Sequence, residues 1–117
     1  MKRIILSVLC SFAVAIASAQ QWAPVGDNIR TRWAEEINPA CPLPEYPRPQ
    51  MVRGEWQNLN GMWNYAVTAD DAQYAAQGQI LVPYPLESSL SGVGRRLAKN
   101  ETLWYERQFT VPKKWKG

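Results

Sequence analysis

The sequence predicts an all-β fold of the β-sandwich type that is incomplete within this chain. Three segments alternate apolar and polar residues, or form short apolar runs bounded by turn residues, as β-strands do. The 117 residues include nine Pro and seven Gly, which argue against a helical bundle. At 46% hydrophobic residues, the chain is too apolar for a disordered tail. Its length allows one small domain and excludes a two-domain enzyme.

Residues 1–19 are predicted to form a secretory signal peptide. Lys2 and Arg3 begin it, an apolar stretch follows, and Ala17-Ser18-Ala19 supplies small residues for cleavage after Ala19. The alternative is a membrane anchor, which needs about 20 apolar residues, but the polar Gln20-Gln21 comes too soon. We therefore expect an exported protein, periplasmic or extracellular, without stable membrane insertion after cleavage.

Residues 20–52 are expected to form an extension that ends in a proline-rich strap. Asp27 or Asn28 is a candidate cap for a short helix that gathers Ile29, Trp33 and Ile37 on one side. Between residues 39 and 49, five of eleven residues are Pro, which predicts a stiff strap with little regular hydrogen bonding. Such a strap is either a PxxP ligand for an SH3-like domain or a segment laid across a larger domain. Export favours the second role.

Residues 53–117 are expected to form the first part of the sandwich. Residues 62–67 alternate with period two, which predicts a strand with Trp63, Tyr65 and Val67 on its inward face. Asn60-Gly61, just before it, suits a tight turn, and Trp56 ends the incoming segment on the other side.

Two further strands are predicted after a polar excursion at residues 70–77. Residues 78–84 form a short apolar run that Pro83 and Pro85 end. Residues 101–111 alternate again and direct one apolar set toward the core, with Arg107 as a rim residue or a paired charge within it. That set is Leu103, Tyr105, Phe109 and Val111.

Three strands are too few to close a sandwich, which needs about seven or eight. Residues 103–111 would keep an unpaired edge and a half-covered apolar face, which is an aggregation hazard. We therefore expect this chain to be an N-terminal fragment of a longer protein, poorly soluble by itself. The alternative is a small complete domain closed by dimerisation.

Composition excludes several kinds of site and partner. The chain has no His and two Cys, so we expect no metal site, no cofactor and no Ser-His-Asp triad. Signal cleavage leaves Cys41 as a lone cysteine, which we expect to be a small packed residue rather than a nucleophile. The net charge of +3 includes Lys2 and Arg3, so the exported chain is close to neutral and a nucleic-acid partner is not expected.

Four motifs in order resemble the start of glycoside hydrolase family 2 proteins of the β-galactosidase and β-glucuronidase type. They are PLPEYPRPQMVR (residues 42–53), WQNLNGMWNYAV (56–67), GQILVPYPLESSLSGV (78–93) and LWYERQFTVPKKWKG (103–117). The resemblance implies that this region is an N-terminal sugar-binding domain with a galactose-binding-like jelly roll. An immunoglobulin-like domain and a catalytic (β/α)8 barrel would follow it and pack against it, and the barrel would carry both catalytic glutamates.

The resemblance therefore implies no catalytic residue in this chain. Glu35/Glu36 and Asp70/Asp71 are adjacent pairs on polar segments, whereas retaining hydrolysis needs two carboxylates about 5 to 5.5 Å apart. Loops of the first domain approach the barrel mouth in this architecture. Glu87, Ser88 and Ser91 of the loop ESSLSG are therefore candidate substrate-binding residues, unless the loop only caps the sheet.

Exposed Trp side chains would provide stacking platforms for sugar rings. Trp63 and Trp104 lie on predicted strands and are expected in the core, as is Trp56 beside its turn, whereas Trp22, Trp33 and Trp115 lie outside them. The expected activity is hydrolysis of β-galactosides or β-glucuronides by the longer protein, with carbohydrate as partner and an inactive isolated chain. The alternative is a stand-alone extracellular carbohydrate-binding or adhesion β-sandwich without catalysis.

Overall fold

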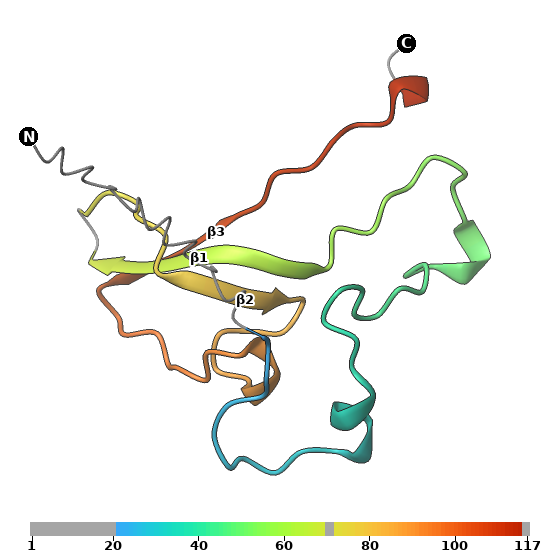
Figure 1. The fold of residues 1–117 in the computed structure, drawn as a ribbon. Coiled ribbons are helices and arrows are strands. Elements are labelled where there is room, and N and C mark those ends of the chain that lie inside the picture. Colours follow the sequence, from blue (N-terminus) through green and yellow to red (C-terminus); the bar gives the residue numbers. More distant parts are fainter. Residues whose placement is uncertain (1–20, 70–71, 116–117) are drawn as a thin grey trace, which may run out of the picture.

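The computed structural model describes residues 21–69 and 72–115 (Figure 1). Its strands are β1 (Gly61–Ala69), β2 (Gly78–Val82) and β3 (Glu101–Glu106). Its helices are short 3-10 turns: η1 (Arg32–Glu36), η2 (Pro49–Met51), η3 (Ser89–Ser91) and η4 (Lys113–Trp115). The predicted signal peptide and the Asp70/Asp71 pair lie outside the described residues. None of the described helices has the length and apolar character that a membrane span needs.

The three strands form an antiparallel sheet in the order β2-β1-β3, with β1 in the centre. Trp63 of β1 lies opposite Ile80 of β2, and Val67 lies opposite Leu103 of β3. The all-β prediction is therefore confirmed at the level of a strand-rich antiparallel fold.

The core lies on the face of the sheet that the alternation predicts. Val67, Ile80 and Leu86 are buried together, and partly buried neighbours pack against them: Trp63, Tyr65, Val93 and Leu103. The opposite face is also covered near the centre, because Ala66 and Leu81 have no exposed surface. Apolar burial on both faces explains why β2 is a continuous apolar run rather than an alternating one.

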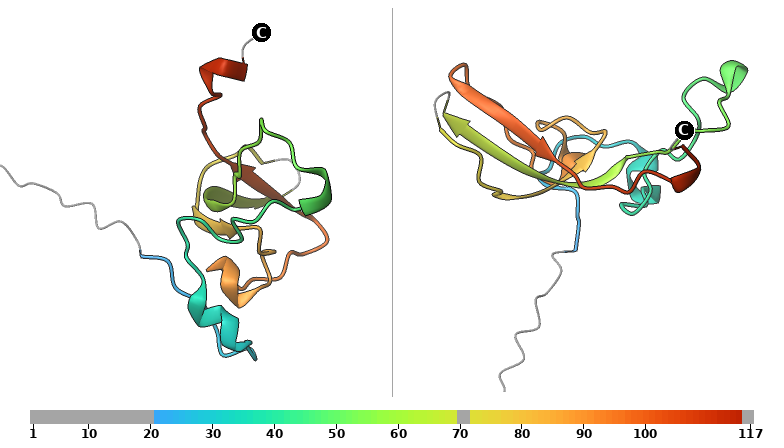
Figure 2. Two further views of the ribbon diagram at one scale, coloured as in Figure 1. Left: turned by 90° about the vertical axis from the view of Figure 1, so that its right-hand side faces the viewer. Right: turned by 90° about the horizontal axis from the view of Figure 1, so that it is seen from above.

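β3 is shorter than the predicted strand and ends at Glu106. Arg107 then donates from Nη1 to the backbone carbonyls of Leu59, at 2.5 Å, and Asn60, at 2.9 Å. Its guanidinium lies 6.0 Å from the centre of the Trp63 ring, so Arg107 is half-buried and bound to backbone rather than paired with a carboxylate. Beyond it, residues 107–115 extend past the end of the sheet (Figure 2). Phe109 and Val111 are exposed there, and Tyr105 within β3 is 43% exposed, so the predicted place of these three residues in the core is wrong.

The predicted tight turn at Asn60-Gly61 is also wrong. Gly61 is the first residue of β1 and has φ of 128°. A Cβ there would lie 3.1 Å from Arg107 Nη1 and 3.6 Å from the Ala40 carbonyl oxygen. Glycine is therefore required by a close approach of three segments, and the residues before it form no strand.

The predicted helix around residues 27–37 shrinks to η1. Thr31 precedes it with extended backbone and makes no side-chain cap hydrogen bond. Ile29 is fully exposed and Trp33 is 59% exposed, whereas Ala34 is the buried residue of η1. The spacing of four therefore fails as a guide, because a 3-10 turn repeats every three residues.

The proline-rich strap follows η1 without regular structure, as predicted, until η2 begins at Pro49. Two asparagines from beyond the strap hold it: Asn58 Nδ2 donates to the Leu43 carbonyl at 3.0 Å, and Asn60 Nδ2 donates to the Pro42 carbonyl at 3.2 Å. These hydrogen bonds replace the backbone ladder that proline cannot form. Cys41, predicted to be packed, is exposed.

Candidate functional site

The loop between β2 and β3 carries the predicted substrate-binding residues. It leaves β2 after Val82 and enters η3 through Ser88, whose Oγ accepts a hydrogen bond from the Leu90 N–H at 3.2 Å. Gly92 ends η3 with φ of 81°. A Cβ on Gly92 would lie 3.2 Å from the Trp22 indole, so glycine both allows the turn and admits the N-terminal segment.

Ser91 determines the shape of this loop from inside it. The residue has no exposed surface. Its hydroxyl lies 2.7 Å from the Ser88 carbonyl oxygen and 3.1 Å from that of Leu86, and it accepts from the N–H groups of Val93 at 3.0 Å and Gly94 at 3.3 Å. A hydroxyl has one proton and two lone pairs. These internal contacts occupy all of them, which makes Ser91 a positioning residue.

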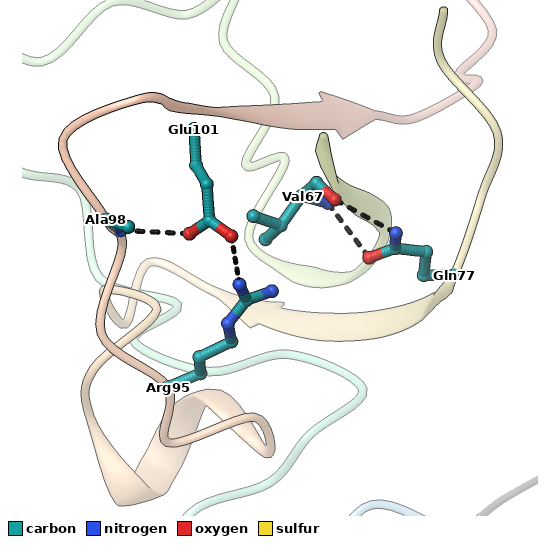
Figure 3. Close-up of polar contacts among 5 residues, drawn as sticks. All are labelled: Val67, Gln77, Arg95, Ala98 and Glu101. Atoms are coloured by element: carbon teal, nitrogen blue, oxygen red, sulfur yellow. Dashed lines mark hydrogen bonds and ion pairs between the residues drawn. The ribbon is translucent and has the colours of Figure 1, made fainter. Parts of the chain in front are cut away.

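The opposite end of the loop is fastened where β3 begins (Figure 3). Arg95 and Glu101 form an ion pair, and the same carboxylate accepts from the Ala98 N–H at 2.9 Å. The Arg95 N–H also donates to the Leu86 carbonyl at 3.1 Å. Contacts at both ends therefore hold η3 in a defined place against β2.

The N-terminal segment docks along η3, a contact that no sequence pattern predicted. The Val25 N–H donates to the Ser89 carbonyl at 3.0 Å, and Trp22 Nε1 donates to the Leu90 carbonyl at 3.2 Å. These two hydrogen bonds bring residues 28–34 beside residues 87–90, although the two segments are far apart in the chain.

A cleft of about 300 Å³ lies between these two segments. Its volume is at the lower end of the range for small-molecule sites, roughly 300 to 1,000 Å³. Glu87 and Ser88 line it together, whereas Ser91 does not. The other lining residues are Asn28, Ile29, Arg30, Thr31, Ala34, Ser89 and Leu90.

Ser89 lines this cleft and has an unsatisfied, buried hydroxyl. The residue is 5% exposed, and its Oγ has no hydrogen-bond partner within the described part of the chain. A buried hydroxyl without a partner costs about 1 to 3 kcal/mol. The Oγ has almost no exposed surface, so a ligand hydroxyl would remove that cost only after the Ser89 side chain turned toward the cleft. Ser89 and Arg30 were not among the predicted site residues.

The cleft combines groups of both charges around polar, uncharged ones. Arg30 supplies N–H donors, Glu87 supplies acceptor oxygens, and the Asn28 amide supplies both. The negative charge of Glu87 also reaches Tyr105 of β3, whose pKa is raised first by burial and then by this carboxylate. Such a set of donors and acceptors suits an uncharged ligand with several hydroxyl groups.

The tryptophans are distributed differently from the expectation. Trp63 packs against the core as expected, but Trp104 and Trp56 are 41% and 39% exposed. Trp104 points to the other face of β3, where its Nε1 donates to Thr68 Oγ1 at 2.8 Å. Trp33 lies outside the strands and is exposed. Trp22 also lies outside them, but it is half-buried and donates a hydrogen bond to the Leu90 carbonyl.

Comparison with models of protein families and with curated proteins gives no match to this chain.

Proposed function

We propose that this chain is the N-terminal sugar-binding domain of an exported glycoside hydrolase of family 2 type. In this proposal the chain forms the first part of a galactose-binding-like jelly roll, and a barrel domain outside this sequence hydrolyses β-galactosides or β-glucuronides. The order of the four sequence motifs supports it. β1 begins within the second motif, β2 and η3 lie within the third, and β3 ends within the fourth.

The observation that carries the binding function is a cleft of opposite charges, one of whose lining residues, Ser89, has a buried and unpartnered hydroxyl. Once the Ser89 side chain turns toward the cleft, a sugar hydroxyl can donate to its Oγ or accept from it, and neighbouring hydroxyls can reach Arg30 and Glu87. Hydrogen bonds to charged groups contribute roughly 1.5 to 3 kcal/mol each. Two of them together with the Ser89 contact would offset part of the cost of association, roughly 4 kcal/mol or more, for one sugar ring.

The chain itself supplies no catalytic pair under this proposal. Retaining hydrolysis needs an acid and a nucleophile about 5 to 5.5 Å apart across the scissile bond. Glu35 and Glu36 are neighbours on η1 and both are exposed, and successive side chains on a helix point in different directions. Glu87 is the carboxylate of the cleft, and its role is to bind hydroxyl groups.

The binding role is tested by titrating the purified chain with methyl β-D-galactopyranoside and with methyl β-D-glucuronide. We expect saturable binding that Arg30→Ala and Glu87→Gln each weaken about tenfold, the loss of one charged hydrogen bond. Lys99→Ala is the matched control, because Lys99 is an exposed cation that does not line the cleft. Binding that survives both cleft variants would contradict the assignment of this site.

A stand-alone binding module would bind the same sugars, so a second experiment separates the two proposals. Sequencing the gene beyond codon 117 should find an open frame that continues into a barrel domain with two glutamates. A stop codon at that point, together with a stable folded product, would favour the module without catalysis.

A further inference from the structure

A second hollow lies on the other side of η1, between this helix and the proline-rich strap. It measures about 550 Å³, a volume typical of small-molecule sites. Trp33 and Tyr84 are its aromatic residues, and Glu36, Asn38 and Glu45 are among its polar ones. It shares no lining residue with the cleft at Ser89. We call this hollow the strap groove.

The strap side of the groove is fixed although it has no regular secondary structure. Leu43, which lines the groove, has φ of 48°, a left-handed conformation that costs a non-glycine residue about 1 to 2 kcal/mol. The side chains of Asn58 and Asn60 hold Leu43 in this conformation by donating to its carbonyl oxygen, at 3.0 and 3.4 Å. Strained backbone that is held by such contacts is characteristic of binding sites.

Trp33 offers this groove an aromatic platform. Its side chain is 59% exposed, which leaves a large apolar ring in water at the edge of a hollow. The Arg32 guanidinium lies 4.8 Å from the centre of the ring and restricts its orientation. A second cation would be repelled by Arg32, whereas the C–H face of an uncharged sugar ring would not be.

The carboxylates of the groove are free to accept hydrogen bonds. Among the described residues, the ion pair of the chain joins Arg95 to Glu101, and neither Glu36 nor Glu45 takes part in one. The Asn38 Oδ1 accepts from the Ala40 N–H at 3.0 Å, and the amide of the same side chain also has N–H donors. Acceptors and an amide donor around an exposed indole form a recognisable set for a sugar ring.

We propose that the strap groove binds an uncharged pyranose. The ring stacks on Trp33, and its hydroxyls donate to the carboxylates of Glu36 and Glu45. The proposal goes beyond the function proposed above, because it adds a second binding site that does not depend on the Ser89 cleft. Two carboxylates against one guanidinium also make the groove unfavourable for a sugar acid.

The test follows the Trp33 indole signal in proton–nitrogen correlation spectra of the purified chain. Methyl β-D-galactopyranoside and methyl β-D-glucopyranoside are added up to about 10 mM, tenfold above a millimolar Kd. We expect at least one of them to shift this signal saturably, and D-glucuronate to bind more weakly. Trp33→Ala should weaken binding about tenfold, as followed by the Tyr84 backbone signal. Glu36→Gln, which keeps the shape, should weaken it severalfold.

Two controls separate this groove from other sites. Trp104→Ala removes an exposed indole on β3, outside the groove, and Arg30→Ala changes the Ser89 cleft, so both should leave the groove affinity unchanged. Failure of both methyl glycosides to shift the Trp33 signal would overturn the proposal, as would full binding by Trp33→Ala. Either result leaves the proposal for the Ser89 cleft intact, because that proposal is tested by Arg30 and Glu87.

Discussion

Gln77, just before β2, makes side-chain hydrogen bonds to β1 of the kind that a strand backbone would make. Its side-chain amide accepts from the Val67 N–H and donates to the Val67 carbonyl, both at 3.0 Å (Figure 3). Its own backbone N–H donates to the Tyr65 carbonyl at 2.9 Å. The Gln77 side chain therefore adds one more pair of hydrogen bonds to the backbone of β1. It does so beyond Tyr65, the last residue of β1 that pairs with the backbone of β2.

Replacing this amide should destabilise the sheet. Gln77→Ala leaves the N–H and the carbonyl of a buried residue without partners, which costs about 1 to 3 kcal/mol. Urea unfolding followed by tryptophan fluorescence measures the change. Gln79→Ala is the control, because that side chain is exposed on β2. Equal effects of the two substitutions would show that the Gln77 bonds contribute nothing specific.

Tyr105 reports on the charge of the cleft. Its pKa is raised above the ordinary value of 10.0 by burial first and by the Glu87 carboxylate second. The folded chain therefore holds this proton more tightly than the unfolded chain does. The resulting stability is fully present below a pH of about 10 and is lost as the pH rises through the higher folded pKa.

Glu87→Gln should lower the pKa of Tyr105 while leaving it above the ordinary value, since burial remains. A titration of phenolate absorbance measures this, and Tyr105→Phe identifies the signal. Glu45→Gln, on the strap, should not change it. An unchanged Tyr105 pKa in Glu87→Gln would place that carboxylate away from β3.

Apolar residues within β3 stabilise the fold, whereas apolar residues beyond its end only limit solubility. Leu103 packs against the core, whereas Phe109 is 52% exposed beyond the end of the strand. Phe109→Thr should therefore change the free energy of unfolding by less than about 0.5 kcal/mol and raise the concentration at which the chain stays monomeric. Leu103→Thr should destabilise by about 1 kcal/mol or more. Light scattering and urea unfolding distinguish the two effects, and a large loss of stability in Phe109→Thr would contradict this division.

The strands were predictable from local pattern, whereas the contacts that join them were not. Alternation identified β1 and its inward face because the period of a strand is local. Arg107, Asn60 and Gln77 act on backbone groups of other segments, and no periodicity records such a contact. The site divides in the same way: Glu87 and Ser88 stood out as a polar loop, but Arg30 reaches the cleft only because Trp22 and Val25 dock on that loop.

For the whole molecule, we propose that this chain binds the sugar and that another domain hydrolyses it. The isolated chain is therefore expected to hydrolyse no glycoside. Purified chain should not release nitrophenol from nitrophenyl β-galactoside or β-glucuronide, because the acid and the nucleophile are proposed to lie on another domain. Turnover that persists after repurification would contradict the proposal that hydrolysis belongs to another domain.

Mass measurement of the exported product should find it beginning at Gln20.

The central claim is that the cleft at Ser89 binds a sugar, and one substitution tests it by two readouts. Ser89→Ala removes a buried hydroxyl that has no partner in the described part of the chain, so the unliganded chain should gain about 1 kcal/mol in its free energy of unfolding. The same change should weaken binding of the better methyl glycoside severalfold in calorimetric titration, because the ligand loses its partner. A variant that is more stable and binds less well is the predicted result. A variant that binds the sugar as well as the natural chain does would contradict the claim.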